Sequence, residues 1–403
     1  MVKFIHAADL HLDTPFSGLE QTSKPLAEKL RQAPFQSLAK LVDLALEETV
    51  DFVLFAGDLY NTEQVNIKAQ SLFIEQMKRL EEASIPVLLI RGNHDYITDE
   101  ANTLSLPFPK NIKTYTEDVK THIIKTAEKE RVAVTGFSYN SQWVFDRKIR
   151  DYPKKRQDVD LQIGLLHGSL EGVETKQGNY APFSISELRE KNYDYWALGH
   201  IHQRQQISTN PLAYYSGNIQ GLQKNETGEK GCLLVEWTTR EQNVQFVPTA
   251  PMVWETRDLE ISEATNVSEL FALIRDNTSE LSYTEDILID LTLHADDTAN
   301  EKIVHFVQTQ DFKEQLEKQL NLPKVWLASV SFVFEEGEDR QTLEALYPDV
   351  WEKVLEQTED PTVFREMTEG IFDQIPKKYL NEPMDDDYRR AMIQQAIAEI
   401  YLK

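Results

Sequence analysis

The sequence is poor in cysteine and has no long apolar run. Cys232 is the single cysteine among 403 residues, so no disulfide can form within the chain and nothing indicates an oxidising compartment. No apolar run approaches the roughly 18–20 residues that cross a bilayer. The N-terminal MVKFIHAADLH turns polar too early for the apolar core of a signal peptide. We therefore expect a cytoplasmic protein with no membrane association.

Positive charge is also scarce. The chain has 42 Lys and Arg against 67 Asp and Glu, a net charge of -25 that opposes binding to a phosphate backbone. The imbalance is uneven, because residues 251–403 hold 34 acidic and 14 basic side chains while residues 1–250 hold 33 and 28. One stretch in the first part, FDRKIRDYPKKRQD (145–158), has six Lys or Arg and two aromatic residues. It is either a solvated loop or a surface for phosphate.

The first 250 residues alternate between strand and helix patterns. Apolar residues recur at spacings of three and four over 34–48, and residues 64–84 have a helical pattern too. Short apolar runs that alternate with helices predict an α/β domain with buried sheets. The predicted strands are 2–9, 51–58, 85–95, 132–138, 161–168, 194–202, 214–218 and 231–239.

The pattern changes after residue 250. Residues 251–335 predict a small β-α-β-α-β module, and the acidic run EEGEDRQ (335–341) then leads into helices only. The last helix carries an apolar stripe of Ile393, Ile397 and Ile400. This stripe is suited to docking a partner or to a core contact within the chain.

Polar residues recur where the predicted strands end, which is where α/β folds place their functional sites. Asp, His and Asn are ligands for metals such as Mn, Fe or Zn, and the absence of Cys ligands argues against a structural Zn site. D-x-H or GD alone is weak, since Gly-Asp is ordinary turn chemistry, and a lone His is usually structural. All five motifs in one order make coincidence improbable. The residues are Asp9, His11, Asp58, Asn93, His94, Asp95, His167, His200 and His202.

The ordered set D-x-H, GD, GNH, H and GH-x-H resembles the signature of the calcineurin-like metallophosphoesterases. Within that superfamily, HAADLHL, FAGDLY, IRGNHDY, LLHG and ALGHIH resemble the SbcD-like DNA repair exonucleases. HAADLHLDTPFSGL is most similar to the YhaO branch of that family. Two positions differ from the SbcD-like pattern: Asp13 stands where Gly is typical, and Tyr60 where Phe is common.

The resemblance covers about residues 1–240 and implies an α/β fold. Its core would be two mixed β-sheets sandwiched by helices, with a small α/β capping domain and a C-terminal helical segment. The implied domains are a metallophosphoesterase nuclease domain (1–250), a capping domain that resembles DNA-recognition domains (251–335) and a helical partner-binding segment (336–403).

The resemblance also implies a ligand set for two divalent ions, with Mn²⁺ as the first choice. Two such ions polarise a phosphoryl oxygen and lower the pKa of a bound water. Asp58 would bridge them, because it belongs to both implied sets. One ion would be held by Asp9, His11, Asp58 and His202, and the other by Asp58, Asn93, His167 and His200.

The remaining polar residues are given other roles. By resemblance, His94 orients the substrate or protonates the leaving oxygen. Asp95 has two possible roles: it holds the His94 imidazole or the loop, or it is only an aspartate that caps the turn. Arg91 either contacts a phosphate or forms a structural ion pair. His6 is expected in the core or behind the ligands, and Cys232 is expected to be buried. His122, His294 and His305 are expected to be structural or surface residues.

Three functions follow from the motifs. The first is a Mn-dependent DNA nuclease that acts on duplex ends or single strands, forms a homodimer and binds an SbcC-like coiled-coil ATPase, all by resemblance. The second is a phosphodiesterase or phosphatase that acts on a smaller ester with the same metal core. Protein serine/threonine phosphatases are disfavoured, since YNT and GNHD stand where they have DRG and GNHE. The third, a scaffold without catalysis, is disfavoured because no ligand is missing.

Overall fold

The computed structural model forms two compact units, Met1–Phe334 and Glu335–Lys403. None of the helices in the part of the chain that it describes is long and apolar enough to cross a membrane. The structure describes residues 1–14, 24–61, 66–97, 106–172, 179–279, 281, 283–309, 311–320, 322–335, 348–360, 362–364, 368 and 393.

The first sheet of unit 1 has six strands in the order β12-β11-β1-β2-β3-β4. The four strands from β1 to β4 are parallel, and β11 and β12 extend the sheet in antiparallel fashion. Parallel strands must be covered on both faces, which explains their near-continuous apolar sequences. The strands are β1 (Val2–Ala7), β2 (Phe52–Ala56), β3 (Val87–Ile90), β4 (Ile112–Thr114), β11 (Gly231–Trp237) and β12 (Gln242–Pro248).

The second sheet also has six strands, in the order β5-β6-β7-β8-β10-β9. Its central strands β6, β7, β8 and β10 are parallel, and the edge strands β5 and β9 pair antiparallel to their neighbours. Both sheets are therefore mixed. The strands are β5 (Lys120–Lys125), β6 (Arg131–Gly136), β7 (Leu161–His167), β8 (Tyr195–Gly199), β9 (Gln205–Thr209) and β10 (Leu212–Tyr215).

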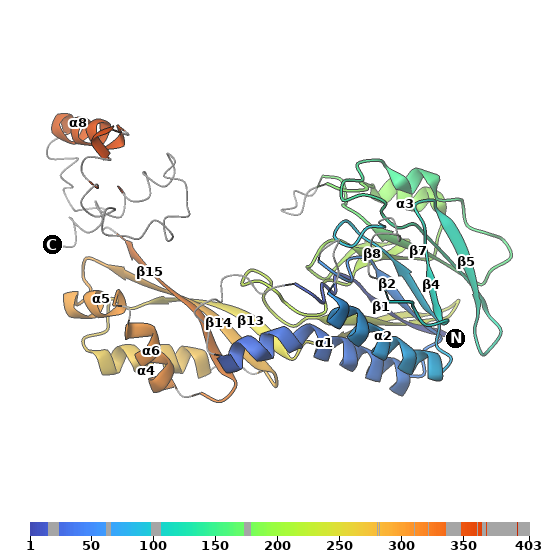
Figure 1. The fold of residues 1–403 in the computed structure, drawn as a ribbon, viewed down its shortest axis with the longest axis horizontal. Helices are drawn as coiled ribbons and strands as arrows, with labels where there is room; N and C mark the ends of the chain where they lie inside the picture. The colour runs from blue at the N-terminus through green and yellow to red at the C-terminus, as the bar shows by residue number, and fades with distance from the viewer. Residues whose placement is uncertain are drawn as a thin grey trace. The chain divides into compact units, whose positions relative to one another are not determined.

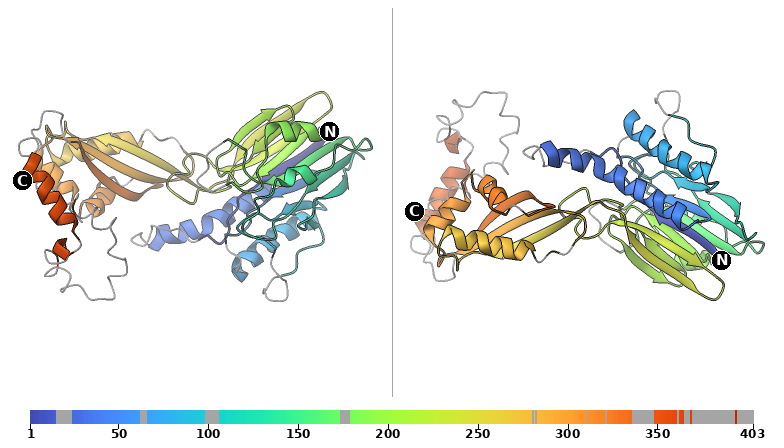
Figure 2. Two further views of the ribbon diagram at one scale, coloured as in Figure 1. Left: turned by 90° about the horizontal axis from the view of Figure 1, so that it is seen from above. Right: turned by 90° about the horizontal axis from the view of Figure 1, so that it is seen from below.

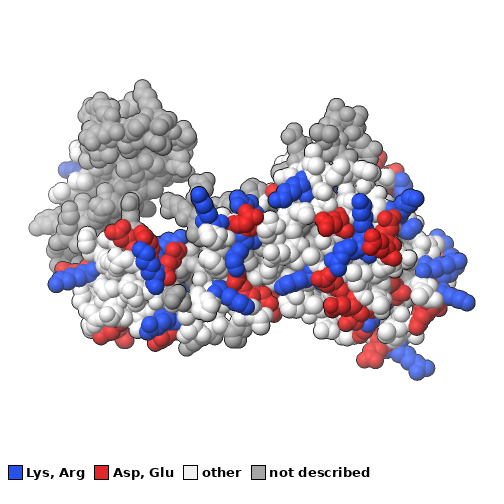
Figure 3. Space-filling model, turned by 60° about the horizontal axis from the view of Figure 1, so that its bottom comes forward, with Lys and Arg blue, Asp and Glu red and all other residues white. Residues whose placement is uncertain are grey.

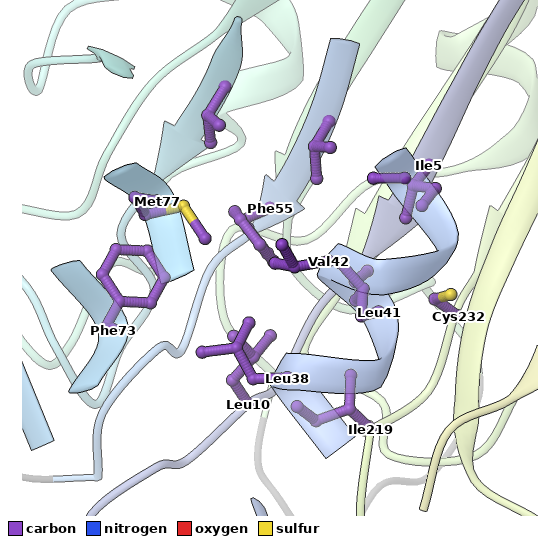
Figure 4. Close-up of a cluster of buried hydrophobic side chains, with 14 of the residues drawn as sticks. Ile5, Leu10, Leu38, Leu41, Val42, Phe55, Phe73, Met77, Ile219 and Cys232 are labelled. Carbon is purple, nitrogen blue, oxygen red and sulfur yellow. The ribbon is translucent and has the colours of Figure 1, made fainter. Parts of the chain in front are cut away.

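Helices cover the outer faces of both sheets (Figures 1 and 2). Helices α1 (Lys24–Glu47) and α2 (Ile67–Glu82) pack side by side on the first sheet, where Leu41 and Phe73 are fully buried (Figure 4). Helix α2 begins at Asn66, whose side chain accepts a hydrogen bond from the Lys68 N–H. The short helices η2 (Lys148–Asp151) and α3 (Ile185–Lys191) belong to the second sheet's side.

A central core lies between the two sheets. Phe4 of β1 stacks on Phe52 of β2 with ring centroids 5.0 Å apart, and Tyr195 of β8 meets Phe4 edge-on at 5.4 Å. The layers thus run helix, sheet, sheet, helix. This arrangement confirms the predicted core of two mixed sheets sandwiched by helices.

A third sheet, of order β13-β14-β15, follows residue 250 and has a core of its own. β13 and β14 are parallel, as the predicted β-α-β pattern requires. Leu26 and Leu30 of α1 pack against Met252 and Trp254 of β13. The predicted domain boundary at residue 250 stays a prediction. The elements are β13 (Met252–Glu260), α4 (Val267–Ser279), β14 (Asp286–Asp296), α5 (Glu301–Val307), α6 (Asp311–Leu320) and β15 (Val325–Glu335).

The second unit contains helix α8 (Pro348–Glu359). Its Val350 and Val354, four residues apart, are exposed. The predicted stripe of the last helix lies mostly outside the described residues, since only Ile393 of its three isoleucines is described.

Candidate metal centre

The predicted polar residues meet where strands from both sheets end. Asp9 and His11 follow β1, Asp58 follows β2 and Asn93 follows β3. His167 is the last residue of β7 in the second sheet, and His200 and His202 follow β8. All seven side chains are buried or nearly so. The structure thus brings together every residue that the sequence predicted as a ligand.

Two groups of ligand atoms form within this cluster. The first joins Asp9, His11 and His202, and the second joins Asp9, Asp58 and His167, each with its atoms within 4.8 Å of one another. In the first group, Nε2 of His11 lies 3.1 Å from Nε2 of His202. The carboxylate of Asp9 contributes to both groups, although the resemblance assigned it to one ion only.

Asp58 and Asn93 connect the remaining histidines. Asp58 Oδ2 lies 3.3 Å from His167 Nε2 in its own group and 3.8 Å from His11 Nε2 in the first group, so this oxygen is near a histidine of each group. Asn93 Oδ1 lies 3.0 Å from His167 Nε2 and 3.2 Å from His200 Nδ1. Each of the two residues thus places a side-chain oxygen near the ring nitrogens of two predicted ligand histidines.

Two histidines are fixed from behind by acceptors. His167 Nδ1 donates to the carbonyl oxygen of Ala56 at 2.9 Å, and His202 Nδ1 lies 2.6 Å from Glu226 Oε1. Such partners set the tautomer and aim the other nitrogen, here Nε2, at a metal. Glu226 is itself held by Asn218 Nδ2 at 2.8 Å and by the N–H of Leu222 at 2.7 Å.

Glu226 was missed in the sequence analysis. It lies in the polar loop QKNETGEKG, 24 positions after His202, and no motif spacing marks it. Only the return of that loop towards β8 places the carboxylate behind the histidine.

Four of the site residues have left-handed backbone. The φ angles are 52° at Asp9, 43° at His11, 51° at Asp58 and 101° at His200. Positive φ is uncommon outside glycine, and such conformations cluster at functional sites because the surrounding structure must hold them. Hydrogen bonds do so here: the N–H of His200 donates to the side-chain Oδ1 of Asp9 at 2.9 Å, and the N–H of His11 donates to the carbonyl oxygen of Asp58 at 3.1 Å.

Two motif glycines make room for His167. A Cβ at Gly57, where φ is 96°, would lie 2.4 Å from His167 Nδ1. A Cβ at Gly92 would lie 2.2 Å from Asp58 Oδ1 and 2.7 Å from His167 Nε2. At Gly92 the reason for glycine is therefore space for the ligands, since its φ is not positive, whereas Gly57 needs both space and the unusual φ.

Burial and close pairing shift the titration of these groups. Burial raises the pKa of Asp9 to about 6 and lowers that of His11 to about 3. Burial disfavours the charged forms of Asp58 and His167 as well, but their mutual attraction is stronger. It lowers the pKa of Asp58 well below its usual range and raises the pKa of His167 to about 9.

This donor set fits divalent cations. The cluster offers carboxylate and amide oxygens together with imidazole nitrogens, which suit Mn, Fe and Zn. The two Nε2 atoms of His11 and His202 face one another at 3.1 Å, so a proton or a cation must separate their lone pairs. A metal bound by this pair would satisfy both.

His94 and Asp95 follow Asn93 but differ in their contacts. The N–H of His94 donates to Asp58 Oδ1 at 3.0 Å, and its half-buried ring meets the ring of His11 edge-on at 5.1 Å. Asp95 is buried and accepts from the N–H of Gly92 at 2.7 Å and of Leu59 at 3.0 Å. Through its two oxygens Asp95 connects the GNHD loop to the GD loop. These contacts correspond to the expected role of holding the loop.

The histidines set aside in the sequence analysis lie where they were expected. His6 is fully buried between Tyr195 and the carbonyl oxygen of Leu198, and burial lowers its pKa to about 3. His122 is half-buried on β5, and His305 is exposed on α5. His294 lies 3.4 Å from Asp258. Cys232 is buried in β11, as predicted.

The basic stretch at 145–158 is largely ion-paired. Arg147 pairs with Glu187 at 2.5 Å and with Glu171 at 3.0 Å. Lys155 pairs with Asp194 at 2.6 Å, and other pairs in the stretch are more exposed. These ion pairs attach the loop to the rest of the domain. They also neutralise part of its positive charge, so less of that charge is available to bind phosphate than the sequence suggests.

The chain is similar in sequence to several known proteins. The calcineurin-like phosphoesterase family matches residues 2–204. The chain is 36% identical over 280 residues to the uncharacterized metallophosphoesterase YhaO of Bacillus subtilis, covering 69% of this chain and 68% of that one. It is 24% identical to the DNA double-strand break repair protein Mre11 of Sulfurisphaera tokodaii (77% and 90% covered). It is 26% identical to one of the subunits of the nuclease SbcCD of Staphylococcus epidermidis (65% and 72% covered).

Proposed function

The chain belongs to the calcineurin-like phosphoesterases, a family of hydrolases, and from this membership we propose that it is a nuclease dependent on two divalent metal ions. Its proposed reaction is hydrolysis of phosphodiester bonds at DNA ends, in repair or recombination, with Mn²⁺ as the preferred ion. The same core acting on a smaller phosphate ester is the alternative.

The extent of the match to the Mre11 protein carries the choice of DNA. That match covers 77% of the chain, whereas residues 1–250 are less than two thirds of it, so the similarity continues beyond the metal domain. A small phosphate ester would occupy the metal centre alone, so it would not need an additional sheet and helices for binding. A polymer that extends beyond the metal centre could contact them.

The roles proposed for the site residues follow from their positions. Two divalent ions, when bound, supply the positive charge that stabilises the reacting phosphate and lowers the pKa of water. Asp58 stands where it can hold both ions, and Asn93 adds an oxygen without adding negative charge, which keeps the centre attractive to phosphate. The proposed ligands are Asp9, His11, Asp58, Asn93, His167, His200 and His202.

His94 is the proposed proton donor. Its backbone N–H is fixed on Asp58, so the imidazole has a defined place beside His11 at the edge of the cluster. A group within reach of the reacting phosphate can protonate the leaving 3′-oxygen or orient the substrate. Asp95 supports this role indirectly, because it holds the loop that carries His94.

Charge limits where DNA can bind. On the face drawn in Figure 3, Lys and Arg side chains are interspersed with Asp and Glu over the described residues. The acidic excess lies behind residue 250, and we propose that it faces a basic partner surface instead of the duplex. The exposed Val350 and Val354 of α8 would add an apolar contact to an SbcC-like ATPase. A homodimer remains part of this proposal by resemblance.

The direct test is cleavage of linear duplex DNA labelled at either end. The purified chain with Mn²⁺ should shorten the duplex, and a chelator or His94→Ala should abolish the shortening. The label that is lost first gives the direction. Hydrolysis of a bis-aryl phosphate without DNA cleavage, including in the presence of an SbcC-like ATPase, would overturn the nuclease and favour a small phosphodiester.

A further inference from the structure

Two aromatic side chains close to the metal centre are exposed. Trp143 is 56% exposed and Phe145 is 66% exposed, while Val144 between them is 6% exposed. The two rings lie on the same side of the loop, because both contact the ring of Tyr180. Leaving two large aromatic rings in water gives up the burial that such rings usually contribute, which favours a role in binding.

Both rings rest on Tyr180, which links them to the metal centre. The ring centroid of Tyr180 lies 5.6 Å from that of Trp143 and 5.8 Å from that of Phe145. Its other neighbour is His200, a proposed metal ligand, whose ring it meets edge-on at 5.5 Å. Tyr180 itself is only 9% exposed. The exposed pair is therefore one aromatic ring away from the centre.

The backbone fixes this arrangement. The N–H of Ala181 donates to the carbonyl oxygen of Val144 at 2.7 Å, which positions Tyr180 beside the loop. The carbonyl oxygen of Tyr180 accepts from the N–H of Ser169, two residues after His167. The aromatic loop and the metal-binding strand end are thus held together by main-chain hydrogen bonds.

We propose that Trp143 and Phe145, supported by Tyr180, stack on an unpaired base of a nucleic-acid substrate whose phosphate lies at the metal centre. This inference rests on the proposed nuclease function. Aromatic faces bind any base by stacking, so the surface would accept a frayed or single-stranded end without regard to sequence. Arg150 lies in the same loop region. Its side chain is 72% exposed and 3.8 Å from the carboxylate of Glu187, and it can contact the phosphates of the nucleic-acid strand.

Binding of two matched oligonucleotides tests the surface. One is a labelled single strand of thymidines, and the other has the same phosphates but an abasic sugar at every position. Fluorescence anisotropy measures the binding of each oligonucleotide to the full chain in the presence of Mn²⁺. All proteins carry His94→Ala, so that the strand is not cleaved during the measurement. The variants are Trp143→Ala with Phe145→Ala, Trp143→Phe as the conservative change, and Ile123→Ala as a partly exposed apolar control on β5.

We expect the double variant to bind the intact strand about tenfold more weakly or worse, from the usual contribution of one stacked base. The abasic strand should bind equally to the parent and the double variant, and Trp143→Phe and Ile123→Ala should resemble the parent. An unchanged unfolding midpoint and unchanged Mn content would show that the double variant is intact.

Other outcomes separate failure of this surface from failure of the proposed function. If the parent binds intact and abasic strands equally, or if the double variant loses both equally, stacking is wrong and the nuclease proposal stands. If the double variant keeps full oligonucleotide affinity but loses self-association in light scattering, the rings form an interface between copies instead. If the parent binds neither strand and the wild type cleaves no DNA, both proposals fail.

Discussion

His202 Nδ1 lies 2.6 Å from Glu226 Oε1, so the nitrogen that faces His11 and Asp9 is set by a carboxylate from a different loop. Glu226 therefore belongs to the surroundings of the metal centre although it lies in none of the sequence motifs. It also gives the first testable consequence of the geometry, because loss of such a partner weakens metal binding without removing a ligand.

Glu226→Ala should lower the affinity for Mn²⁺ by about 10- to 100-fold, the usual effect of removing the partner of a metal-binding histidine. Glu226→Gln keeps an acceptor for His202 and should lose less. Calorimetric titration of the metal-free chain with Mn²⁺ measures both. Equal affinity in Glu226→Ala and the wild type would show that the loop merely packs against His202.

His94→Ala should keep its metal and lose turnover. General acid catalysis contributes about 10²- to 10⁴-fold, so cleavage of DNA should fall by at least the lower figure. A bis-aryl phosphate has a leaving group that needs no proton, and its hydrolysis should fall much less if His94 is the acid. An equal fall for both substrates would assign His94 to orientation instead, and loss of Mn in elemental analysis would contradict its assignment outside the ligand set.

Gly92→Ala should disturb the metal centre from a position that is not a ligand. Its Cβ would lie 2.2 Å from Asp58 Oδ1, so the carboxylate or the loop must move, with a stability cost of about 1–3 kcal/mol. We expect Mn affinity to fall together with the unfolding midpoint. Gly172→Ala is the matched control: its Cβ meets no atom within 4 Å, so it should cost stability through its φ of 83° and leave Mn binding intact.

Metal binding should release a proton near neutral pH. Burial opposes the charged form of His167, but Asp58 raises its pKa to about 9 in the metal-free chain, so the imidazole is protonated at pH 7. A metal needs the neutral imidazole. Apparent Mn affinity should therefore rise about tenfold per pH unit as pH increases towards 9 and then level off. Calorimetry at pH 7, 8 and 9 checks this, and an affinity constant over that range would contradict it.

Below pH 6 the dependence should steepen. Burial raises the pKa of Asp9 to about 6, so this carboxyl takes up a proton that the metal must also displace as the pH falls. The same titrations at pH 5.5 and 6.5 measure this second proton.

The meeting of the proposed ligands in one cluster could be predicted from the sequence because their signal is local. His167 ends an apolar strand, and Asp9, Asp58 and Asn93 follow the ends of apolar strands by two or three residues. Parallel strands bring such ends to one edge of a sheet. The buried strands and the helices on them were predicted for the same reason. The helix α1 was predicted too short, since it starts at Lys24, ten residues before the predicted start.

Features that depend on long-range packing were not predicted. The edge strands β5 and β12 are partly exposed, so their sequences lack the apolar run that marks β1 or β7. Glu226 reaches His202 only through the return of its loop, and the positive φ of His200 is imposed by the fold around it. The exposure of Trp143 could not be predicted from the sequence either, because aromatic side chains are usually buried.

The metal content of Asp58→Asn tests the central claim most directly, because Asp58 Oδ2 lies near a histidine of each group of ligand atoms. Elemental analysis after dialysis against Mn²⁺ should give about two ions per wild-type chain. Asp58→Asn should retain at most one weakly bound ion and should lose hydrolysis. Two tightly bound ions in Asp58→Asn, or a single ion in the wild type, would contradict a dinuclear centre shared at this residue.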